Sequence, residues 1–122
     1  MDNISSDIYK EYILSIYSNL SNKREINTKT VSFEYNPLCG DKILIFLFVE
    51  NDTIKDASFS GDGCILSQVS AEILTESIKG MTIMEAKEIN LEYILKKLDL
   101  ENLISPSRLK CIEVAINALR KI

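Results

Sequence analysis

The chain contains no histidine and no tryptophan among its 122 residues. The absence of histidine excludes the Ser-His-Asp and Cys-His nucleophile pairs and every metal site built on imidazole. Basic residues are also few, with 14 lysines and arginines against 18 acidic residues and a net charge of −4. No basic field is therefore available to gather phosphates, which argues against nucleic acid as a partner.

The sequence also lacks the signals of export and membrane insertion. The first residues, MDNISSDIYKEYIL, show no basic region followed by a small-residue cleavage site. The longest apolar run, Ile43 to Val49, has the length of a strand and is far too short to cross a bilayer. The balance of 46% hydrophobic and 26% charged residues is typical of one globular domain, which we expect to span residues 1–122. We expect a cytoplasmic protein that does not contact a membrane.

Only three cysteines are present. An odd number cannot be used up in internal disulfides, so a reducing compartment is the simpler interpretation. Taken singly, any of the three is compatible with a small buried core side chain.

The apolar pattern predicts the order of elements. Helical spacing between Ile8 and Leu20 indicates an amphipathic helix. Val31 to Tyr35 then alternates apolar and polar residues as an edge or half-buried strand does. Residues 42–50 predict a more buried strand, and NDT turns the chain into a third strand over residues 54–60. Three consecutive strands suggest an antiparallel meander.

The second half of the chain is predicted to be helical. Apolar rows indicate a helix over residues 65–78, with Gly80 at the C′ position. Thr82 and Glu85 form the pattern of a capping box, and a further helix follows over residues 91–98. Ser105 and Pro106 predict the start of the last helix. The fold class is therefore α+β, a three-stranded antiparallel sheet with an N-terminal helix and C-terminal helices packed on it.

Two cysteines bracket the hairpin of the second and third strands. Cys39 and Asp41 are two positions apart where a turn becomes a strand, so their side chains project to the same side. Cys64 follows GDG and opens a helix, where unpaired backbone N–H groups favour an anion. Both turns lie at the same end of the hairpin, so these residues can share one metal ion. Each motif by itself is also ordinary turn chemistry.

Cys111 lies in the first turns of the last helix, with Arg108 on the same flank and Lys110 beside it. These cations favour the thiolate form. The cysteine spacings match none of the paired C-x-x-C zinc patterns. Cys111 is equally compatible with plain packing at the border of an apolar stripe, and Arg108 and Lys110 with a solvated helix edge.

Three segments in order, NPLCGD, FSGDGCILSQVSAEILTESIKG and SPSRLKCIEVAINAL, resemble the U-type iron–sulfur cluster scaffold family. Its members include IscU, SufU and the N-terminal domain of NifU. The resemblance runs from about Ser6 to Ile122. It implies an α+β fold and one site, for zinc or a [2Fe–2S] cluster, formed by three cysteines and an aspartate. Matched position by position, the ligands are Cys39, Asp41, Cys64 and Cys111.

The resemblance also implies a function and partners. Such proteins accept sulfur from a PLP-dependent cysteine desulfurase, assemble a [2Fe–2S] cluster and transfer it to downstream acceptors. Cys39 is the expected sulfur acceptor and Cys111 the alternative. A zinc-dependent sulfurtransferase that relays persulfide sulfur to a separate assembly complex would use the same ligands. A third possibility is a small interaction protein whose zinc is purely structural. The residues leave a non-enzymatic scaffold and a sulfurtransferase both open.

The details near the last cysteine point to different branches of the family. The IscU branch carries a histidine just before this cysteine, whereas Lys110 stands here, as in the SufU branch. The proline-rich chaperone-recognition sequence of the IscU branch is replaced by LISPSRLKC. The additional segment that the SufU branch carries between its second and third cysteines is largely missing. The chain is closer to SufU around the last cysteine, and the subtype stays open.

Overall fold

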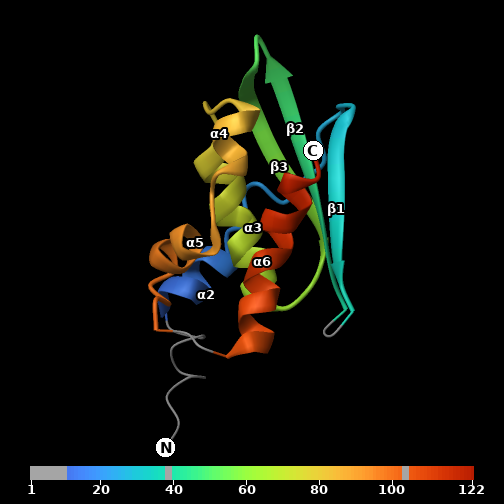
Figure 1. The fold of residues 1–122 in the computed structure, drawn as a ribbon. Coiled ribbons are helices and arrows are strands. Elements are labelled where there is room, and N and C mark those ends of the chain that lie inside the picture. Colours follow the sequence, from blue (N-terminus) through green and yellow to red (C-terminus); the bar gives the residue numbers. More distant parts are fainter. Residues whose placement is uncertain (1–10, 38–39, 103–104) are drawn as a thin grey trace, which may run out of the picture.

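The structure is a computed structural model that describes residues 11–37, 40–102 and 105–122. The elements are α2 (Glu11–Tyr17), β1 (Thr30–Asn36), β2 (Asp41–Glu50), β3 (Thr53–Asp62), α3 (Ile65–Ile78), α4 (Ile83–Lys87), α5 (Leu91–Lys97) and α6 (Pro106–Arg120). Helices α3 and α6 pack on one face of the three-stranded sheet, with α2, α4 and α5 around them (Figure 1). The predicted α+β class is confirmed.

The sheet is an antiparallel meander in the order β1-β2-β3, as predicted. Asn36 pairs with Asp41, and Lys42 pairs with Asp62. The end of β1, the start of β2 and the end of β3 therefore meet at one end of the sheet. This arrangement confirms that the two turns bracketing the β2–β3 hairpin lie at the same end.

Local sequence signals explain how several elements begin and end. Asn51 and Asp52 both adopt positive φ, at 51° and 65°, as a tight two-residue hairpin turn requires. Gly80 adopts a φ of 92° after α3, as a C′ glycine does, and its N–H donates to the carbonyl of Ile54. The capping box of Thr82 and Glu85 is present at the start of α4.

One helix end and one helix cap differ in detail from the expectation. α2 (Glu11–Tyr17) ends before Leu20, to which the apolar spacing extended, and its predicted start at Ile8 lies outside the described part of the chain. Ser105 is the N-cap of α6 with Pro106 at the first position, but its side chain makes no capping hydrogen bond. Within the described residues, no helix has the length and apolar character needed to span a membrane.

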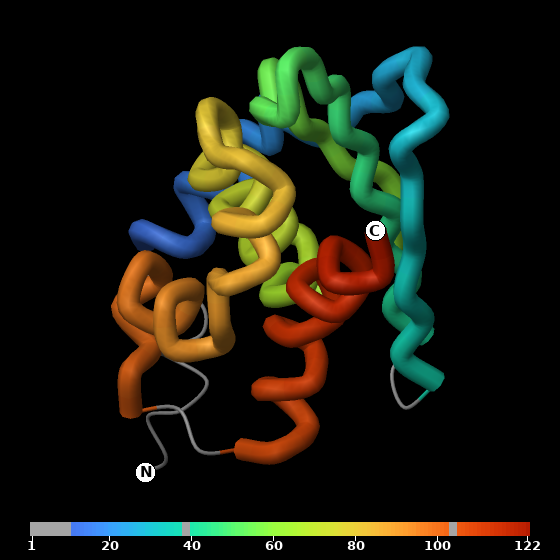
Figure 2. Tube along the Cα trace, turned by 45° about the horizontal axis from the view of Figure 1, so that its top comes forward, coloured from blue at the N-terminus to red at the C-terminus, as the bar shows by residue number. Residues whose placement is uncertain are grey.

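The core lies between the inner face of the sheet and α3 and α6. Side chains with no exposed surface come from β2 and β3, namely Ile43, Ile45, Leu47 and Phe59. Helix α3 is covered on nearly all sides and buries polar residues as well, namely Ser67, Gln68, Ser70, Glu72 and Thr75. The tube view shows α3 surrounded by the other helices and the sheet (Figure 2). Because α3 is packed on nearly all sides, it fixes the position of the residues at its N-terminus.

Strand β1 exposes its apolar side chains and turns its polar side chains inward, which is the reverse of the usual pattern. Its apolar side chains, Val31, Phe33 and Tyr35, are 40%, 52% and 53% exposed. Its polar side chains turn toward α6, where Ser32 Oγ donates to the carbonyl of Ala118 and Glu34 forms an ion pair with Lys121. The strand is at the edge of the sheet, as expected, but its apolar face is the outer one.

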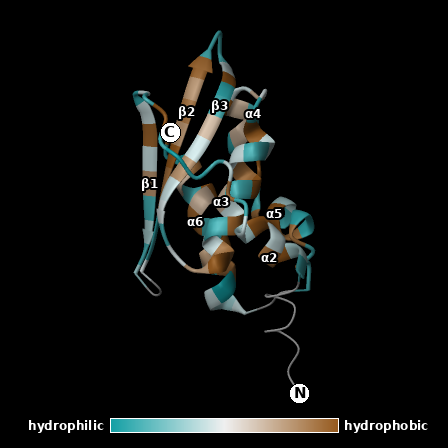
Figure 3. Ribbon diagram, turned by 180° about the vertical axis from the view of Figure 1, so that it is seen from behind, coloured by the Kyte–Doolittle hydropathy of each residue, from teal (hydrophilic) through white to brown (hydrophobic). Residues whose placement is uncertain are grey.

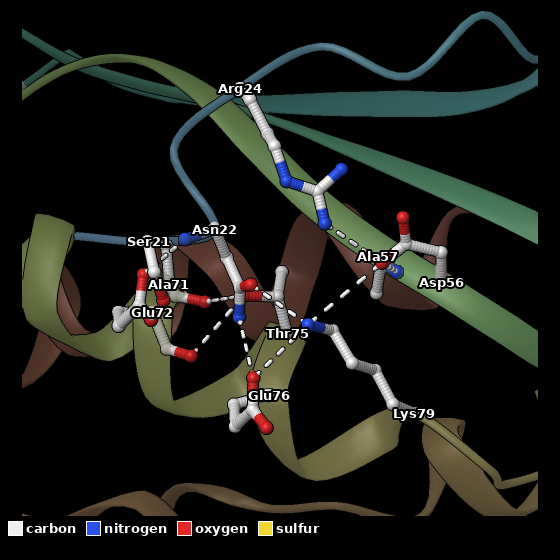
Figure 4. Close-up of polar contacts among 10 residues, drawn as sticks. All are labelled: Ser21, Asn22, Arg24, Asp56, Ala57, Ala71, Glu72, Thr75, Glu76 and Lys79. Atoms are coloured by element: carbon white, nitrogen blue, oxygen red, sulfur yellow. Dashed lines mark hydrogen bonds and ion pairs between the residues drawn. The ribbon is translucent and has the colours of Figure 1, made fainter.

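The connection from α2 to β1 passes over the outer face of the sheet (Figure 3). It is anchored by a group of polar residues that we call the Asn22 cluster, consisting of Ser21, Asn22, Arg24, Asp56, Glu72, Thr75, Glu76 and Lys79 (Figure 4). The backbone N–H of Asn22 donates to the Glu72 carboxylate, and the backbone carbonyl of Asn22 accepts from the N–H of Phe59. Arg24 Nη2 lies 2.9 Å from Asp56 Oδ1. The cluster ties this connection to α3 and β3.

Candidate metal centre

Three of the four predicted ligands converge where the sheet ends and two helices begin. Asp41 is the first residue of β2, Cys64 is the N-cap of α3, and Cys111 lies in the second turn of α6. One ligand atom from each lies within 4.8 Å of the other two. Cys39, the fourth predicted ligand, lies outside the described residues. Asp41, Cys64 and Cys111 are far apart in sequence, and the fold alone brings them together.

Asp41 is fully buried, and its two carboxylate oxygens differ. Oδ1 accepts a hydrogen bond of 2.9 Å from the backbone N–H of Cys64. Oδ2 is buried and has no hydrogen-bond partner in the described part of the chain. Leaving a buried carboxylate oxygen unsatisfied is costly, and coordination of a cation removes the cost. The side chain is thus fixed through one oxygen, and the other has a geometry and burial that fit coordination of a cation.

Cys64 has an extended backbone, with φ −69° and ψ 170°, and its side chain makes no capping hydrogen bond. Its carbonyl accepts from Ser67 Oγ and from the N–H of Gln68, which ties it to the first turn of α3. Its own N–H is used by Asp41. The anion held at this helix start is therefore the carboxylate, and the thiol is left exposed to solvent.

Gly63 and Gly61, which the sequence presented as turn residues, have steric roles here. A Cβ on Gly63 would lie 2.2 Å from Ser67 Oγ and 2.7 Å from Asp41 Oδ1. A Cβ on Gly61 would lie 1.9 Å from the carbonyl oxygen of Lys42, and this glycine has a φ of 117°. Only glycine lets the chain pass this close to the Asp41 carboxylate. Sequence reasoning missed this requirement, although the GDG motif was its signal.

Cys111 is 7% exposed and packs within the core, yet its sulfur also faces the site. Its burial confirms the packing alternative, while ligation stays a prediction that the position of the sulfur is compatible with. Lys110 is exposed and Arg108 is half-buried, as expected for a helix edge. The site has a buried side formed by Asp41 and Cys111 and an open side at Cys64.

The donor set fits zinc or iron. Two thiols and a carboxylate are the ligands that Zn²⁺ and iron–sulfur clusters use, whereas Mg²⁺ and Ca²⁺ prefer oxygen alone. Because Cys64 is exposed to solvent, one of these donors is accessible from outside, which suits a metal that exchanges or reacts. The fold and the site together define a small α+β protein with a candidate metal site of two thiols and one carboxyl group near its surface.

Comparison with known proteins identifies the family. Residues 8–122 match the NifU-like N terminal domain, and this chain belongs to that family. It is 32% identical to the zinc-dependent sulfurtransferase SufU of Bacillus subtilis strain 168, with 93% of this chain and 88% of that protein covered. It is 31% identical to the iron–sulfur cluster assembly scaffold protein IscU of Thermotoga maritima, with 93% and 91% covered.

A solved structure agrees with these relatives. The putative iron–sulfur cluster assembly scaffold protein for the SUF system from Fervidobacterium islandicum AW-1 superimposes with a TM-score of 0.80 at 28% identity. The match covers 96% of this chain and 97% of that one. Both the resemblance stated from sequence and the predicted fold are confirmed.

Proposed function

We propose that this protein is an iron–sulfur cluster assembly scaffold that accepts sulfur from a cysteine desulfurase and assembles and transfers a [2Fe–2S] cluster. The observation that carries the proposal is the convergence of Asp41, Cys64 and Cys111 within 4.8 Å, together with the unpartnered buried oxygen of Asp41. Similarity to the scaffold IscU of Thermotoga maritima supports it. Cys39, two residues before Asp41, is the proposed fourth ligand.

The ligand set suits a site that must release its cargo. Thiolates bind iron strongly, and a single carboxylate is a harder and more weakly held ligand. Asp41 is fixed by the hydrogen bond from Cys64 to Oδ1, so Oδ2 can bind and release a cluster iron without displacing the side chain. We therefore assign Asp41 as the exchangeable ligand. Asp41→Ala should slow cluster transfer to an apo-acceptor, whereas transfer at the wild-type rate with equal cluster occupancy would contradict the role.

Sulfur acceptance is assigned first to Cys39. Its thiolate attacks the outer sulfur of the desulfurase persulfide, the sulfur–sulfur bond breaks, and the desulfurase cysteine leaves as a thiolate. Cys39 then carries the persulfide. Cys111 is the alternative acceptor, but at 7% exposure its sulfur can be reached only after the site opens.

A second function is supported by a specific observation. The chain is similar to the zinc-dependent sulfurtransferase SufU of Bacillus subtilis, and Lys110 precedes the last cysteine. In this alternative the protein relays persulfide sulfur to a separate assembly complex. Zinc bound by Asp41 and the cysteines would stabilise the cysteine thiolates, and the fold would hold these ligands together at the end of the sheet.

Mass spectrometry of single cysteine-to-serine variants tests the acceptor. Each variant is incubated with desulfurase and cysteine, and the added sulfane sulfur is located on the chain. We expect Cys39→Ser to lose rapid acceptance. If Cys39→Ser gains sulfur as fast as wild type, the assignment to Cys39 is wrong.

Anaerobic reconstitution separates the two functions. A visible-absorbing cluster that forms on the protein and passes to an apo-ferredoxin supports the scaffold. Stable zinc that resists exchange for iron, with persulfide turnover, supports the sulfurtransferase. Metal that binds but supports neither reaction would indicate a purely structural site and overturn both.

A further inference from the structure

The outer surface of β1 is an apolar stripe that the fold leaves uncovered. Val31, Phe33 and Tyr35 are each at least 40% exposed and follow one another on the same face of the strand. The alternation is maintained because the polar residues between them are held against α6. Large apolar side chains that gather on one surface usually mark a binding site.

The same strand has an open edge. Within the described part of the chain, β1 is hydrogen-bonded to β2 and to no other strand. Soluble proteins usually protect such an edge with lysine, proline, a bulge or an inward-pointing charge. Thr30–Asn36 contains no lysine, proline or bulge, and its one inward charge is neutralised by an ion pair. The charged residue in the strand, Glu34, turns inward to Lys121. Lys121 Nζ also donates to the carbonyl of Phe33 at 3.2 Å, so a flexible side chain occupies a backbone acceptor of this edge.

The surroundings of the stripe are basic, although the chain as a whole carries a charge of −4. Lys42 Nζ lies 5.3 Å from the centroid of the Phe33 ring, and Lys121 Nζ lies 5.7 Å from it. Lys29, just before the strand, is exposed. An extended segment that alternates apolar and acidic residues would complement both the stripe and its lysines.

We propose that the edge of β1 receives an extended acidic and apolar segment of a partner protein as an added fourth strand. Its apolar side chains would lie on Val31, Phe33 and Tyr35. Its backbone N–H would replace Lys121 at the Phe33 carbonyl, while Lys121 stays paired with Glu34, and Lys42 and Lys29 would meet the carboxylates of the partner. A second copy of the chain fits less well, because it would bring the same lysines together. Since β1 ends at Asn36, opposite Asp41, the partner would be held beside the metal centre.

Fluorescence anisotropy with synthetic peptides tests the proposal on the full chain. One labelled peptide has the length of β1, seven residues, and places valine or phenylalanine at alternate positions with glutamate between them. A second carries lysine in place of glutamate. We expect the acidic peptide to bind at least about ten-fold more tightly, with an affinity that falls as salt is added. Equal binding of the two peptides, or binding of neither, would overturn the proposal.

Two controls separate strand addition from general stickiness. Phe33→Ser should weaken binding of the acidic peptide at least about ten-fold. The matched variant is Phe48→Ser, because Phe48 is 41% exposed on β2 but is not on the open edge. It should leave binding unchanged. Peptides N-methylated along one backbone edge should lose binding, while methylation of the opposite edge is tolerated. Tolerance of both edges would overturn strand addition.

Self-association is measured in the same samples. Analytical ultracentrifugation should show a monomer in wild type and in Phe33→Ser. A wild-type dimer that becomes monomeric in Phe33→Ser would assign the edge to a second copy and overturn the proposal. None of these measurements requires metal or desulfurase, so their failure is distinct from failure of the proposed function.

Discussion

The metal centre and the Asn22 cluster are both polar groups packed against α3, and they differ in how their hydrogen bonds are satisfied. In the Asn22 cluster the amide of Asn22 donates to Thr75 and Glu76 and accepts from Lys79. Glu72 uses both oxygens, one for the N–H of Asn22 and one for Ser21. At the metal centre, Asp41 keeps one buried oxygen without a partner.

Other buried polar atoms also lack partners in the described part of the chain, on Ser58, Gln68 and Ser70. These groups are neutral, so their burial costs less than that of a carboxylate. Asp41 differs because it is an acidic residue whose carboxyl group lies within 4.8 Å of two thiols. The Asn22 cluster is satisfied and ties the chain to α3 and β3, whereas the Asp41 carboxyl oxygen without a partner is the group that we propose binds a metal. The two regions should therefore respond separately to mutation.

The largest effect is expected from Cys64→Ser. Removing a thiolate ligand should lower zinc affinity by at least about 100-fold. This loss is larger than the one expected from removing a residue that only hydrogen-bonds to a ligand. Competition with a chromophoric zinc chelator measures it. The thermal stability of the metal-free protein should hardly change, because the Cys64 side chain is exposed and makes no capping hydrogen bond. Zinc affinity equal to wild type would remove Cys64 from the site.

Two glycine variants separate the geometry of the site from the stability of the fold. Gly63→Ala places a methyl group against Asp41 Oδ1 and Ser67 Oγ, so we expect zinc affinity to fall by roughly 10-fold. Gly80→Ala is the control, because it meets open space but has a φ of 92°. It should cost about 1 kcal/mol of the free energy of unfolding and leave zinc affinity unchanged. If both variants bind zinc like wild type, the close approach at Gly63 does not position Asp41.

Asn22→Ala should lower the stability of the fold and leave zinc affinity unchanged, the reverse of Cys64→Ser. The substitution removes the donor to Thr75 Oγ1, one of the two donors to Glu76 and one of the two hydrogen-bond acceptors of Lys79, although Lys79 and Glu76 remain bonded to each other. We expect the free energy of unfolding to fall by about 2–3 kcal/mol, measured by urea denaturation of the metal-free protein. Zinc affinity of the folded protein should not change. A loss of zinc affinity as large as that of Cys64→Ser would show that the two regions are not independent.

The smallest effect concerns pH. The hydrogen bond from Arg24 lowers the pKa of Asp56, and hydrogen bonds from Asn22 and Lys79 lower the pKa of Glu76. A carboxyl whose pKa is lower in the folded state stabilises the fold above its unfolded pKa, and this stabilisation is lost as the pH falls through the folded pKa. The free energy of unfolding should therefore decline below about pH 4.

Asp56→Asn is the variant that checks this explanation. It should flatten part of the acid decline when urea unfolding of the metal-free protein is repeated at several pH values. Both carboxyls are partly exposed, so the change is expected to be modest. An acid decline identical to that of wild type would show that Asp56 contributes nothing to it.

Much of the fold could be predicted because local signals agreed with the tertiary structure. The period of the apolar residues gave the helices, and the NDT and capping-box motifs marked turns and ends that the structure contains. The convergence of Cys64 with Asp41 followed from antiparallel pairing, which places the two turns at one end of the sheet. These inferences depend only on neighbours in sequence or on hairpin geometry.

Other features depend on contacts that no local pattern encodes. The alternation of Val31, Phe33 and Tyr35 does not tell which face is buried, because α6 decides it through Ser32 and Glu34. The polar connection that contains Asn22 has no period, so its anchoring to α3 could not be anticipated. The burial of Asp41 beneath Gly63 likewise requires the complete fold.

We propose that one metal ion is bound by three thiolates and the carboxylate of Asp41. X-ray absorption fine structure at the zinc edge of the zinc-loaded protein tests it most directly. We predict one zinc per chain, with three sulfur neighbours at about 2.3 Å and one oxygen at about 2.0–2.2 Å. A zinc shell made only of nitrogen and oxygen, or a sulfur shell unchanged in Cys64→Ser, would contradict it.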